Sequence, residues 1–496
     1  MALLIDQLRA MADRHPDETA YLDLLRNEAL TFARWDDEAN RLARHLVSVG
    51  VRPGDRVALL LDSSWAARWM VSYSAIHIAG AVAVPVNTRL TGREIATILT
   101  HARPVLALTS TVLASLLPPI DRVLELDDDV VWLGALGDAA PRIEAPVTDD
   151  DLADLMYTSG TTSLPKGVAV RHRNAHTIGN TEPSWTGQSW IHASPLFTFA
   201  GISFIYNPMK MGMRGIFMSR FDAGSWLRAV AEHRPSMAFL VPSMVQLVAD
   251  HPDFHTADLS SLQMVSIGSA PLPPALHLRL ADRLPETAVS NSYSMTEAGT
   301  AFTFLPPGEI RRRPGSVGQV MAPSEIRIAD PDRPAGDVTE LAVGEIGEVL
   351  IKVGEHHREY YLDPEATART WHGEWLSSGD LGRMDEDGYL YIVGRSKDVI
   401  IRGGNNVHAT DVESVLFEHP AIADVAVVGV PHTVLGEDVG AAVVARPGFE
   451  VTAADIDAFC VDRLADYKRP RTIWFVDELP RNAMGKVLKS KIQPPG

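Results

Sequence analysis

Short runs of apolar, often β-branched residues alternate with longer segments of helical periodicity between Arg56 and Leu108, and this alternation strongly restricts the fold. Each strand-like run is followed by a helix-like segment: 57–61 by 64–78, and 81–85 by 91–101. A strand–helix–strand order is typical of βαβ units with a largely parallel sheet. The same order returns at 238–250 and at 263–284. We therefore expect an α/β fold whose large N-terminal part consists of doubly wound subdomains.

The sequence changes character twice toward its C-terminus. After Gly315, short strand-like runs are separated by Gly, Asp and Pro turns, which predicts a β-rich subdomain. Beyond Lys397 the chain has helices and strands of its own, enough for an α+β domain of about a hundred residues. We expect a large N-terminal domain, residues 1–396, followed by a small, mobile C-terminal domain, residues 397–496.

Composition argues against several classes of protein. The formal net charge of -18 offers no basic excess for a nucleic acid, so none is expected as a partner. The lone Cys460 excludes an internal disulfide. The N-terminus has the charges of an amphipathic helix rather than of a signal peptide, and the longest apolar run, 69–86, is broken by His77, Gly80 and Pro85. We expect a cytoplasmic protein without stable membrane insertion, in which that run forms a buried helix followed by a strand.

Residues 157–168, YTSGTTSLPKGV, place hydroxyl side chains and glycines next to a lysine. Such a segment gathers donors around phosphate oxygens, and we expect it to be a loop between two strands. It is not a Walker phosphate loop, which needs glycine before the lysine and Ser or Thr after it, because Pro165 precedes Lys166 and Gly167 follows. The alternative is a flexible polar surface loop. The candidate phosphate ligands are Thr158, Ser159, Gly160, Thr161, Thr162 and Lys166.

A second motif, NSYSMTE, occupies residues 291–297. An aromatic ring can stack on a purine, a hydroxyl can contact a phosphate, and a carboxylate can hold Mg²⁺ against phosphate oxygens. Tyr293, Thr296 and Glu297 supply these groups. Taken alone, Thr296 and Glu297 are more typical of a helix N-cap with an acid in the first turn. Upstream, GSAPL at 268–272 follows a predicted strand and forms at least a strand-to-helix turn.

Two further motifs combine charged residues with glycine. In WLSSGDL, Asp380 can accept both hydroxyls of a ribose, and Arg395 in GYLYIVGR can reach ribose or phosphate. Between them, DEDG at 385–388 predicts a hairpin turn. In LPRNAMGK, the glycine frees the backbone so that Lys486 can project into another domain's cleft; the alternative is a basic C-terminal tail.

Together, and in this order, these motifs resemble those of the acyl- and aryl-CoA synthetases of the adenylate-forming superfamily, and the resemblance extends over essentially the whole chain. It implies an ATP-dependent acid–thiol ligase that works in two steps. A carboxylic acid and MgATP give acyl-AMP and pyrophosphate, and the thiol of coenzyme A then gives acyl-CoA and AMP. The implied ligands are ATP, Mg²⁺, CoA and a small carboxylic acid, and a homodimer is compatible with the resemblance.

The resemblance also implies roles for individual residues. Tyr293 matches the adenine-stacking residue, Thr296 the α-phosphate contact and Glu297 the magnesium ligand. Lys486 matches the lysine that catalyses adenylation, and Lys397 matches the hinge about which the C-terminal domain turns. Judged alone, Lys397 would be a solvated surface lysine. The other implied groups are Lys166 at the phosphates; Gly268, Ser269, Ala270, Asn291, Asp380 and Arg395 at the nucleotide; and Gly403 and Gly404 at the CoA tunnel.

Three positions depart from the family pattern: Ser163 and Ser294 stand where glycine is usual, and Thr198 stands where many relatives have histidine. The last two lie near the acyl carboxylate in the family. The residues that align with the acyl-pocket walls are mostly apolar, which favours a hydrophobic fatty, alicyclic or aryl acid over a short dicarboxylate; the alternative for each is plain core. These residues are Phe197, Thr198, Phe199, Gly201, Met244, Ser294, Met295, Ala298 and Phe302.

Two alternatives to a CoA ligase stay open. One is a ligase that passes the acyl group to the pantetheine of a carrier protein, which the lack of a fused carrier or reductase domain weakens. The other is a catalytically silent nucleotide-binding protein. Lys486, Glu297, Asp380 and Arg395 together argue against the silent protein, because binding alone would not need the lysine.

Overall fold

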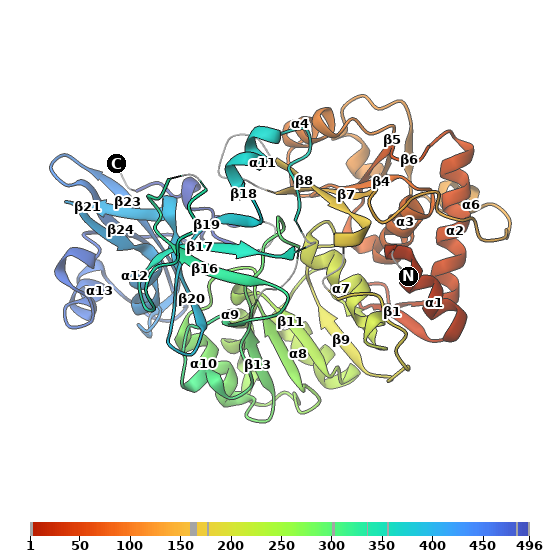
Figure 1. Cartoon of the computed structure of the whole chain (residues 1–496). Coiled ribbons are helices and arrows are strands. Elements are labelled where there is room, and N and C mark those ends of the chain that lie inside the picture. The colour runs from red at the N-terminus through yellow and green to blue at the C-terminus, as the bar shows by residue number, and fades with distance from the viewer. Residues whose placement is uncertain are drawn as a thin grey trace.

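The computed structural model describes residues 3–158, 166–175, 178–299, 303–334, 336–354, 357–482 and 485–494. Within these residues the strands form four sheets (Figure 1). The C-terminal sheet, blue in Figure 1, lies at one end of the molecule, the N-terminal helices, red, lie at the other, and the β-rich sheet, cyan, lies between them. The expected α/β class is confirmed.

The six-stranded sheet contains the predicted βαβ units. Its order is β6-β5-β3-β4-β7-β8, and it is parallel except for the antiparallel last pair. Its strands are β3 (Arg56–Leu60), β4 (Val82–Pro85), β5 (Leu106–Thr109), β6 (Val123–Glu125), β7 (Leu152–Thr158) and β8 (Lys166–Arg171). The helices in this part of the chain are α3 (Ala66–Ile78), α4 (Gly92–Ala102), α5 (Thr111–Ala114) and α6 (Asp129–Leu136). Because α3 joins β3 to β4 and α4 joins β4 to β5, the units predicted between residues 56 and 108 are confirmed.

The second α/β sheet has seven strands in the order β13-β12-β11-β9-β10-β1-β2, and all its pairs are parallel except the antiparallel pair of β1 and β2. Its strands are β1 (Thr19–Asp23), β2 (Glu28–Thr31), β9 (Ser189–His192), β10 (Arg214–Phe217), β11 (Met237–Leu240), β12 (Met264–Ile267) and β13 (Ala288–Asn291). The helices that alternate with its later strands are α7 (Phe199–Lys210), α8 (Ala223–His233), α9 (Pro242–Ala249) and α10 (Pro274–Arg283). The carboxyl ends of its parallel strands meet at one edge, where ligands bind in sheets of this kind.

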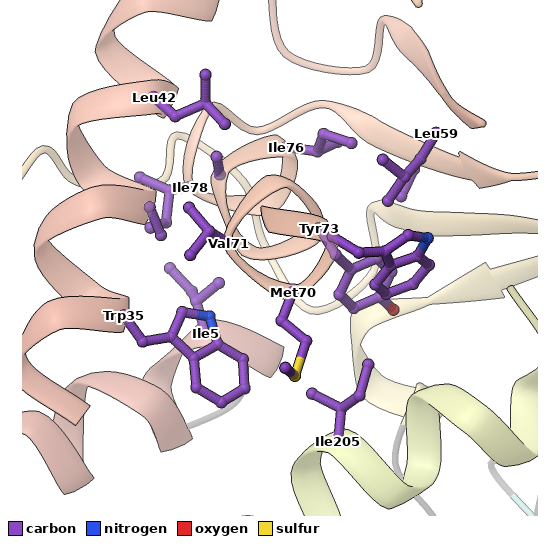
Figure 2. Packing of buried hydrophobic residues seen from close by; sticks show 14 of the residues in the cluster. Ile5, Trp35, Leu42, Leu59, Met70, Val71, Tyr73, Ile76, Ile78 and Ile205 are labelled. Atoms are coloured by element: carbon purple, nitrogen blue, oxygen red, sulfur yellow. The ribbon is translucent and has the colours of Figure 1, made fainter. Parts of the chain in front are cut away.

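Helix α3 is buried on all sides and lies at the centre of the main core. All its residues except Arg68 are buried, so it has no polar face to turn to solvent. Figure 2 shows Ile5 of α1 (Leu4–Arg14), Trp35 of α2 (Phe32–Ser48) and Ile205 of α7 around Met70 of α3. Full burial of each such side chain contributes about 1.5–3 kcal/mol, and this core includes residues of both α/β sheets. The predicted buried helix followed by a strand, and the predicted N-terminal helix, are both confirmed.

The predicted β-rich subdomain is an antiparallel sheet of order β14-β15-β20-β19-β17-β16, to which β18 is added against β19. Its elements are β14 (Thr303–Phe304), β15 (Gly318–Val320), β16 (Glu325–Ala329), β17 (Gly347–Lys352), α11 (Pro364–Thr370), β18 (Trp371–His372), β19 (Trp375–Met384) and β20 (Tyr389–Arg395). The hairpin between β19 and β20 turns at Asp385–Gly388, as predicted.

The C-terminal part is a small α+β unit with a core of its own. Its sheet has the order β22-β21-β24-β23, with β25 paired to β24. Its elements are β21 (Val399–Arg402), β22 (Asn405–His408), α12 (Ala409–Leu416), β23 (Ile422–His432), β24 (Gly436–Ala445), α13 (Ala453–Cys460) and β25 (Thr472–Phe475). The buried residues of this core all lie between Ile400 and Cys460. In the part of the chain that the structure describes, no helix has both the length and the apolar character needed to cross a bilayer.

Candidate active site

The β7–β8 hairpin carries the ends of the predicted phosphate loop. Thr158, the last residue of β7, pairs with Lys166, the first residue of β8. The two ends of the predicted strand–loop–strand arrangement are therefore confirmed. The pairing places the backbone of Lys166 opposite that of Thr158. The predicted ligands Ser159, Gly160, Thr161 and Thr162, together with Ser163 and the pocket residue Phe302, lie outside the described residues.

The carboxyl ends of β12 and β13 bring two predicted nucleotide segments side by side. Ile267 pairs with Asn291 in parallel register, so the turn that starts at Gly268 lies beside the NSYSMTE segment. A Cβ atom at Gly268 would lie 3.2 Å from the hydroxyl oxygen of Ser292, closer than most side chains tolerate. The next residue, Ser269, has a φ of 72° although it is not glycine. Backbone strain of this kind is concentrated at ligand sites and turns.

Tyr293, Asp380 and Arg395 form a hydrogen-bonded cluster. The phenol of Tyr293 donates to Asp380 Oδ2 over 2.6 Å, and Arg395 Nε donates to Asp380 Oδ1 over 2.8 Å. The β19–β20 register pairs Asp380 with Arg395 directly, and the carboxylate is buried. Burial and the neighbouring Asp380 raise the pKa of Tyr293 well above its usual value. Each carboxylate oxygen keeps a lone pair, so Asp380 can still accept a hydroxyl from a ligand.

Thr296 and Glu297 lie in a turn, and no helix begins at them among the described residues. The helix N-cap interpretation of this pair is therefore wrong, because the backbone closes on itself instead: the N–H groups of Ala298 and Gly299 both bond the carbonyl of Met295. The turn leaves both side chains half-buried.

Two residues that sequence reasoning missed contact this turn. The guanidinium of Arg358 donates to the carbonyl of Thr296 over 2.8 Å, and the phenol of Tyr360 donates to Glu297 Oε1 over 3.1 Å. Arg358 is only 1% exposed, and burial lowers its pKa to about 9. No motif or hydrophobic periodicity marks residues 358–360, so the sequence carried no signal for either of them.

Lys486, in the C-terminal domain, lies near the cluster formed by Tyr293, Asp380 and Arg395, which we call the nucleotide cluster. Burial, and then the positive charge of Arg395, lower the pKa of Lys486 to about 8, while Asp380 acts in the opposite direction. The preceding Gly485 has a φ of 77°, and a Cβ atom there would lie 2.8 Å from the Ser243 hydroxyl oxygen in α9. The glycine therefore allows the lysine-bearing segment to lie directly against the N-terminal domain.

The predicted hinge and the predicted CoA-tunnel glycines lie on either side of β21. Lys397 belongs to a short 3₁₀ turn, Ser396–Asp398, that joins β20 to β21. Its side chain is exposed, as expected of a surface lysine, although partial desolvation followed by the charge of Arg395 lowers its pKa. Gly403 and Gly404 form the exposed turn between β21 and β22, with φ values of 56° and 86°. A two-residue hairpin turn with positive φ at both positions favours glycine strongly.

Thr198 and Gly201 have local structural roles at the start of α7. Thr198 is the N-cap: its hydroxyl accepts a hydrogen bond from Gly201 N over 3.0 Å and donates to the carbonyl of Pro195 over 2.7 Å. A Cβ atom at Gly201 would overlap the carbonyl oxygen of Pro195. The hydroxyl that replaces the family's histidine is therefore engaged by its own helix.

The remaining predicted pocket residues differ in their surroundings. Ala298 is fully buried in the core of the β-rich sheet, against which Met295 also packs, so the plain-core interpretation applies to Ala298. Phe199 lies under the guanidinium of Arg358, with 4.3 Å between that group and the ring centroid. Phe197 is half-buried and Ser294 is exposed.

The chemistry of these groups fits a reacting nucleotide. Among the described residues, no cluster of three or more His, Cys, Asp or Glu side chains could hold a metal ion unaided. A single carboxylate such as Glu297 nevertheless fits Mg²⁺, which binds one or two protein carboxylates and completes its shell with phosphates and water. Lys166 and Lys486 add two cations, and the Asp380 carboxylate can accept hydroxyl groups, so these residue types fit a nucleotide whose phosphates react.

Comparison with known proteins supports this description and gives the family. The AMP-binding enzyme model matches residues 8–361, and the AMP-binding enzyme C-terminal domain model matches residues 411–486. The chain belongs to the AMP-binding enzyme family, the adenylate-forming enzymes to which the sequence motifs point.

Similar proteins that align with this chain over nearly their whole length are named as CoA ligases or synthases. The chain is 36% identical over 479 residues to a feruloyl-CoA synthase of Amycolatopsis sp., with 94% of each chain covered. It is 33% identical over 499 residues to the long-chain-fatty-acid–CoA ligase FadD13 of Mycobacterium tuberculosis strain H37Rv, with 98% of this chain and 97% of that protein covered. Among solved structures, O-succinylbenzoate coenzyme A synthetase (MenE) from Bacillus subtilis, in complex with ATP and magnesium ion, has a TM-score of 0.83 at 28% identity and 98% coverage of both chains.

Proposed function

We propose that this chain ligates a hydrophobic carboxylic acid to coenzyme A in two ATP-dependent steps. The observation that carries the proposal is the position of Lys486: Gly485 packs against Ser243 of the N-terminal domain, which brings the partly buried lysine near enough to Asp380 and Arg395 for their charges to act on its pKa. A carboxylate that attacks ATP meets like charges, and a lysine in this position offsets that repulsion. A protein that only bound nucleotide would not need it.

In this proposal the nucleotide lies at the carboxyl ends of β12 and β13. The ring of Tyr293 stacks on the adenine, and the turn at Gly268–Ala270 lies along it. Asp380 accepts the ribose hydroxyls, with Arg395 beside it. The hydrogen bonds from Tyr293 and Arg395 to Asp380 support these roles, because they hold the carboxylate in one orientation before ligand binds.

The first step forms a bond between an oxygen of the acid and the α-phosphorus of ATP, while the bond from that phosphorus to pyrophosphate breaks. Lys166, Thr296 and Lys486 stabilise the negative charge on the phosphates during this step. Glu297 would hold Mg²⁺ at this site, and the ion would supply further charge neutralisation.

In the second step, a different face of the C-terminal domain must lie against the N-terminal domain. We place the domain division at 396/397, so that Lys397 is the hinge and the small domain, residues 397–496, turns about it. This motion withdraws Lys486 and presents Gly403 and Gly404, past which the pantetheine of CoA reaches the acyl-AMP. The CoA thiolate then bonds the carbonyl carbon, and AMP leaves. The short 3₁₀ turn around Lys397 and the separate core of the C-terminal domain support this division.

Several observations support a hydrophobic acid. The hydroxyl of Thr198 is engaged in its helix cap and offers nothing to a second carboxylate. Phe197 and Met244 add apolar, partly buried surface. The two curated relatives described above are named for an aromatic and a long-chain acid.

Pyrophosphate release from ATP tests the whole proposal. Aryl, fatty, alicyclic and short dicarboxylic acids are supplied in turn, with CoA or with a carrier protein that bears pantetheine. Release with a hydrophobic acid and a thioester on CoA supports the ligase. A thioester that forms only on the carrier protein would show that the carrier, and not CoA, is the acceptor. Pyrophosphate release with the dicarboxylic acid alone would overturn the proposed hydrophobic acid. No pyrophosphate release with any acid would favour the catalytically silent protein.

Lys486→Ala tests the catalytic lysine directly. Loss of one preorganised charge-stabilising group typically costs about 10²–10³ in rate, so pyrophosphate release should fall by that factor. Thioester formation from synthetic acyl-AMP should be retained. Lys491→Ala is the matched control, because Lys491 is an exposed lysine nearby in the sequence.

Lys397→Pro tests the hinge. Proline fixes φ and removes an N–H, so the variant should affect adenylation and thioester formation unequally. Equal losses in the two half-reactions, measured separately, contradict the hinge.

We also propose that the enzyme acts in the cytoplasm and without a nucleic-acid partner. The net charge of -18 and the single cysteine support these points. Light scattering of the purified protein distinguishes a monomer from the homodimer that the family resemblance allows.

A further inference from the structure

The segment 357–361 extends the hairpin that carries the phosphate loop. The amide of Ala169 donates to the carbonyl of Glu359 over 2.8 Å, and the amide of Tyr361 donates to the carbonyl of Gly167 over 2.7 Å. Val168 and Tyr360 form the β-bridge between these two bonds. The segment therefore covers the free edge of β8, one residue after the loop ends at Lys166.

Two side chains of this segment hold consecutive residues of the Thr296–Glu297 turn. Residues two apart in an extended chain point to the same side, and Arg358 and Tyr360 are two apart. Arg358 donates to the carbonyl of Thr296 and also to that of Asn174, whereas Tyr360 donates to the carboxylate of Glu297. The backbone of the turn and the carboxylate direction are thus fixed from one segment.

The ring of Tyr360 also contacts the ammonium group of Lys166. The ammonium nitrogen lies 4.7 Å from the ring centroid, within the range of a cation–π interaction. Among the described residues, no carboxylate forms an ion pair with Lys166, so this ring is the partner that the structure gives to the charge. One side chain therefore contacts Lys166, at the end of the phosphate loop, and Glu297, the proposed magnesium ligand.

We propose that Tyr360 is a positioning residue that couples the proposed magnesium ligand to the phosphate-loop lysine. Its hydroxyl engages one oxygen of Glu297, so that the other would be available to Mg²⁺, and its ring holds Lys166 with no direct ion pair between the lysine and that carboxylate. A direct pair would neutralise both groups before MgATP arrives. The inference rests on the proposed function, because it takes Glu297 and Lys166 as ligands of MgATP.

The test measures ATP binding by calorimetry, without acid, over a range of Mg²⁺ concentrations and in EDTA. Tyr360→Phe removes the hydroxyl and keeps the ring. The Mg²⁺ concentration at which the Mg²⁺-dependent gain in ATP affinity is half complete should rise about tenfold, because a hydrogen bond to a charged group is lost. The affinity for ATP in EDTA should stay unchanged. Tyr360→Leu also removes the ring and should weaken ATP binding in EDTA as well.

Double variants show whether the effects pass through the named partners. In a Glu297→Gln background, Tyr360→Phe should shift the Mg²⁺ dependence less than twofold, and in a Lys166→Met background the additional loss caused by Tyr360→Leu should disappear. Tyr361→Phe is the matched control, since the neighbouring tyrosine contacts His101 instead and should leave Mg²⁺ dependence unchanged.

Three outcomes overturn the inference: an unaltered Mg²⁺ dependence in Tyr360→Phe, an equal shift in the Glu297→Gln background, or an equal shift in Tyr361→Phe. The proposed function fails in a different way, namely when the unmodified protein binds no MgATP or releases no pyrophosphate. Thermal unfolding of each variant verifies that it is folded.

Discussion

Arg446 and Asp250 connect the C-terminal domain to the N-terminal domain: a guanidinium nitrogen of Arg446 lies 2.6 Å from Asp250 Oδ1. Asp250 caps the C-terminal end of α9, and Arg446 follows β24. A guanidinium nitrogen of Arg279 in α10 lies 2.6 Å from the same oxygen. Arg279 and Asp250 both belong to the N-terminal domain, so Arg279 holds the carboxylate in place independently of Arg446. Gly485 packs against Ser243 of the same α9, so the contact fixes the arrangement in which the lysine segment meets the nucleotide cluster.

Arg446→Ala should slow adenylation and spare thioester formation. A partly exposed ion pair contributes about 1 kcal/mol, so pyrophosphate release should fall about fivefold. Thioester formation from synthetic acyl-AMP should be unchanged or faster, because it needs the other arrangement of the domains. Arg463→Ala, which removes an exposed arginine in the same domain, is the control. If Arg446→Ala slows both half-reactions equally, the ion pair is not specific to the adenylation arrangement.

The pH dependence of adenylation should report Lys486. Burial and Arg395 lower the pKa of this lysine to about 8, so it is protonated below that pH and neutral above it. The value of kcat/KM for ATP, which reports the free enzyme, should therefore fall as pH rises through about 8. Lys486→Arg keeps its charge at every accessible pH and should remove this descending limb, whatever its effect on the rate. A profile that stays flat to pH 9.5 in the unmodified enzyme would refute a catalytic role for the cation.

Tyr293 should contribute more through its ring than through its hydroxyl. Stacking of an aromatic ring on a base is worth about 1–3 kcal/mol, so Tyr293→Leu should raise the Kd for ATP about 5- to 150-fold. Tyr293→Phe keeps the ring, and Arg395 still holds Asp380, so its Kd should rise much less. Calorimetry with ATP measures both. Equal effects of the two variants would assign the contribution to the hydroxyl bond with Asp380.

Gly299→Ala should destabilise the fold through Arg358. A Cβ atom at Gly299 would overlap the guanidinium, and the residue has a φ of 72°. Overpacking costs about 1–3 kcal/mol and the left-handed backbone about 1–2 kcal/mol more, so the free energy of unfolding should drop by about 2–5 kcal/mol. Gly308→Ala is the control, because its φ is 84° but nothing lies within 4 Å of its Cβ position, so only the backbone cost applies. Denaturant unfolding of both variants measures the difference, and equal losses would show that Arg358 yields without cost.

Local sequence patterns predicted the elements that surround the site. Strand-like runs at 56–108 and 238–284 formed parallel strands with crossover helices, and the Gly- and Asp-rich turns after Gly315 formed the antiparallel sheet. The helix N-cap interpretation, which Thr296 and Glu297 favour when taken alone and the surrounding motifs oppose, failed. It failed because Arg358 and the β-rich core hold that segment in a turn, and such long-range contacts leave no trace in a short window of sequence.

The sequence by itself determined the chemistry of this protein: which cations, carboxylates and aromatic rings are present, and in which motifs. Only the tertiary structure decided which of them meet. Tyr360 and Glu297 are 63 residues apart, and the electrostatic influence of Asp380 on Lys486 depends on how the C-terminal domain lies against α9. Residue type and spacing report local backbone preference, whereas the distance between remote side chains is fixed by the packing of whole sheets and domains.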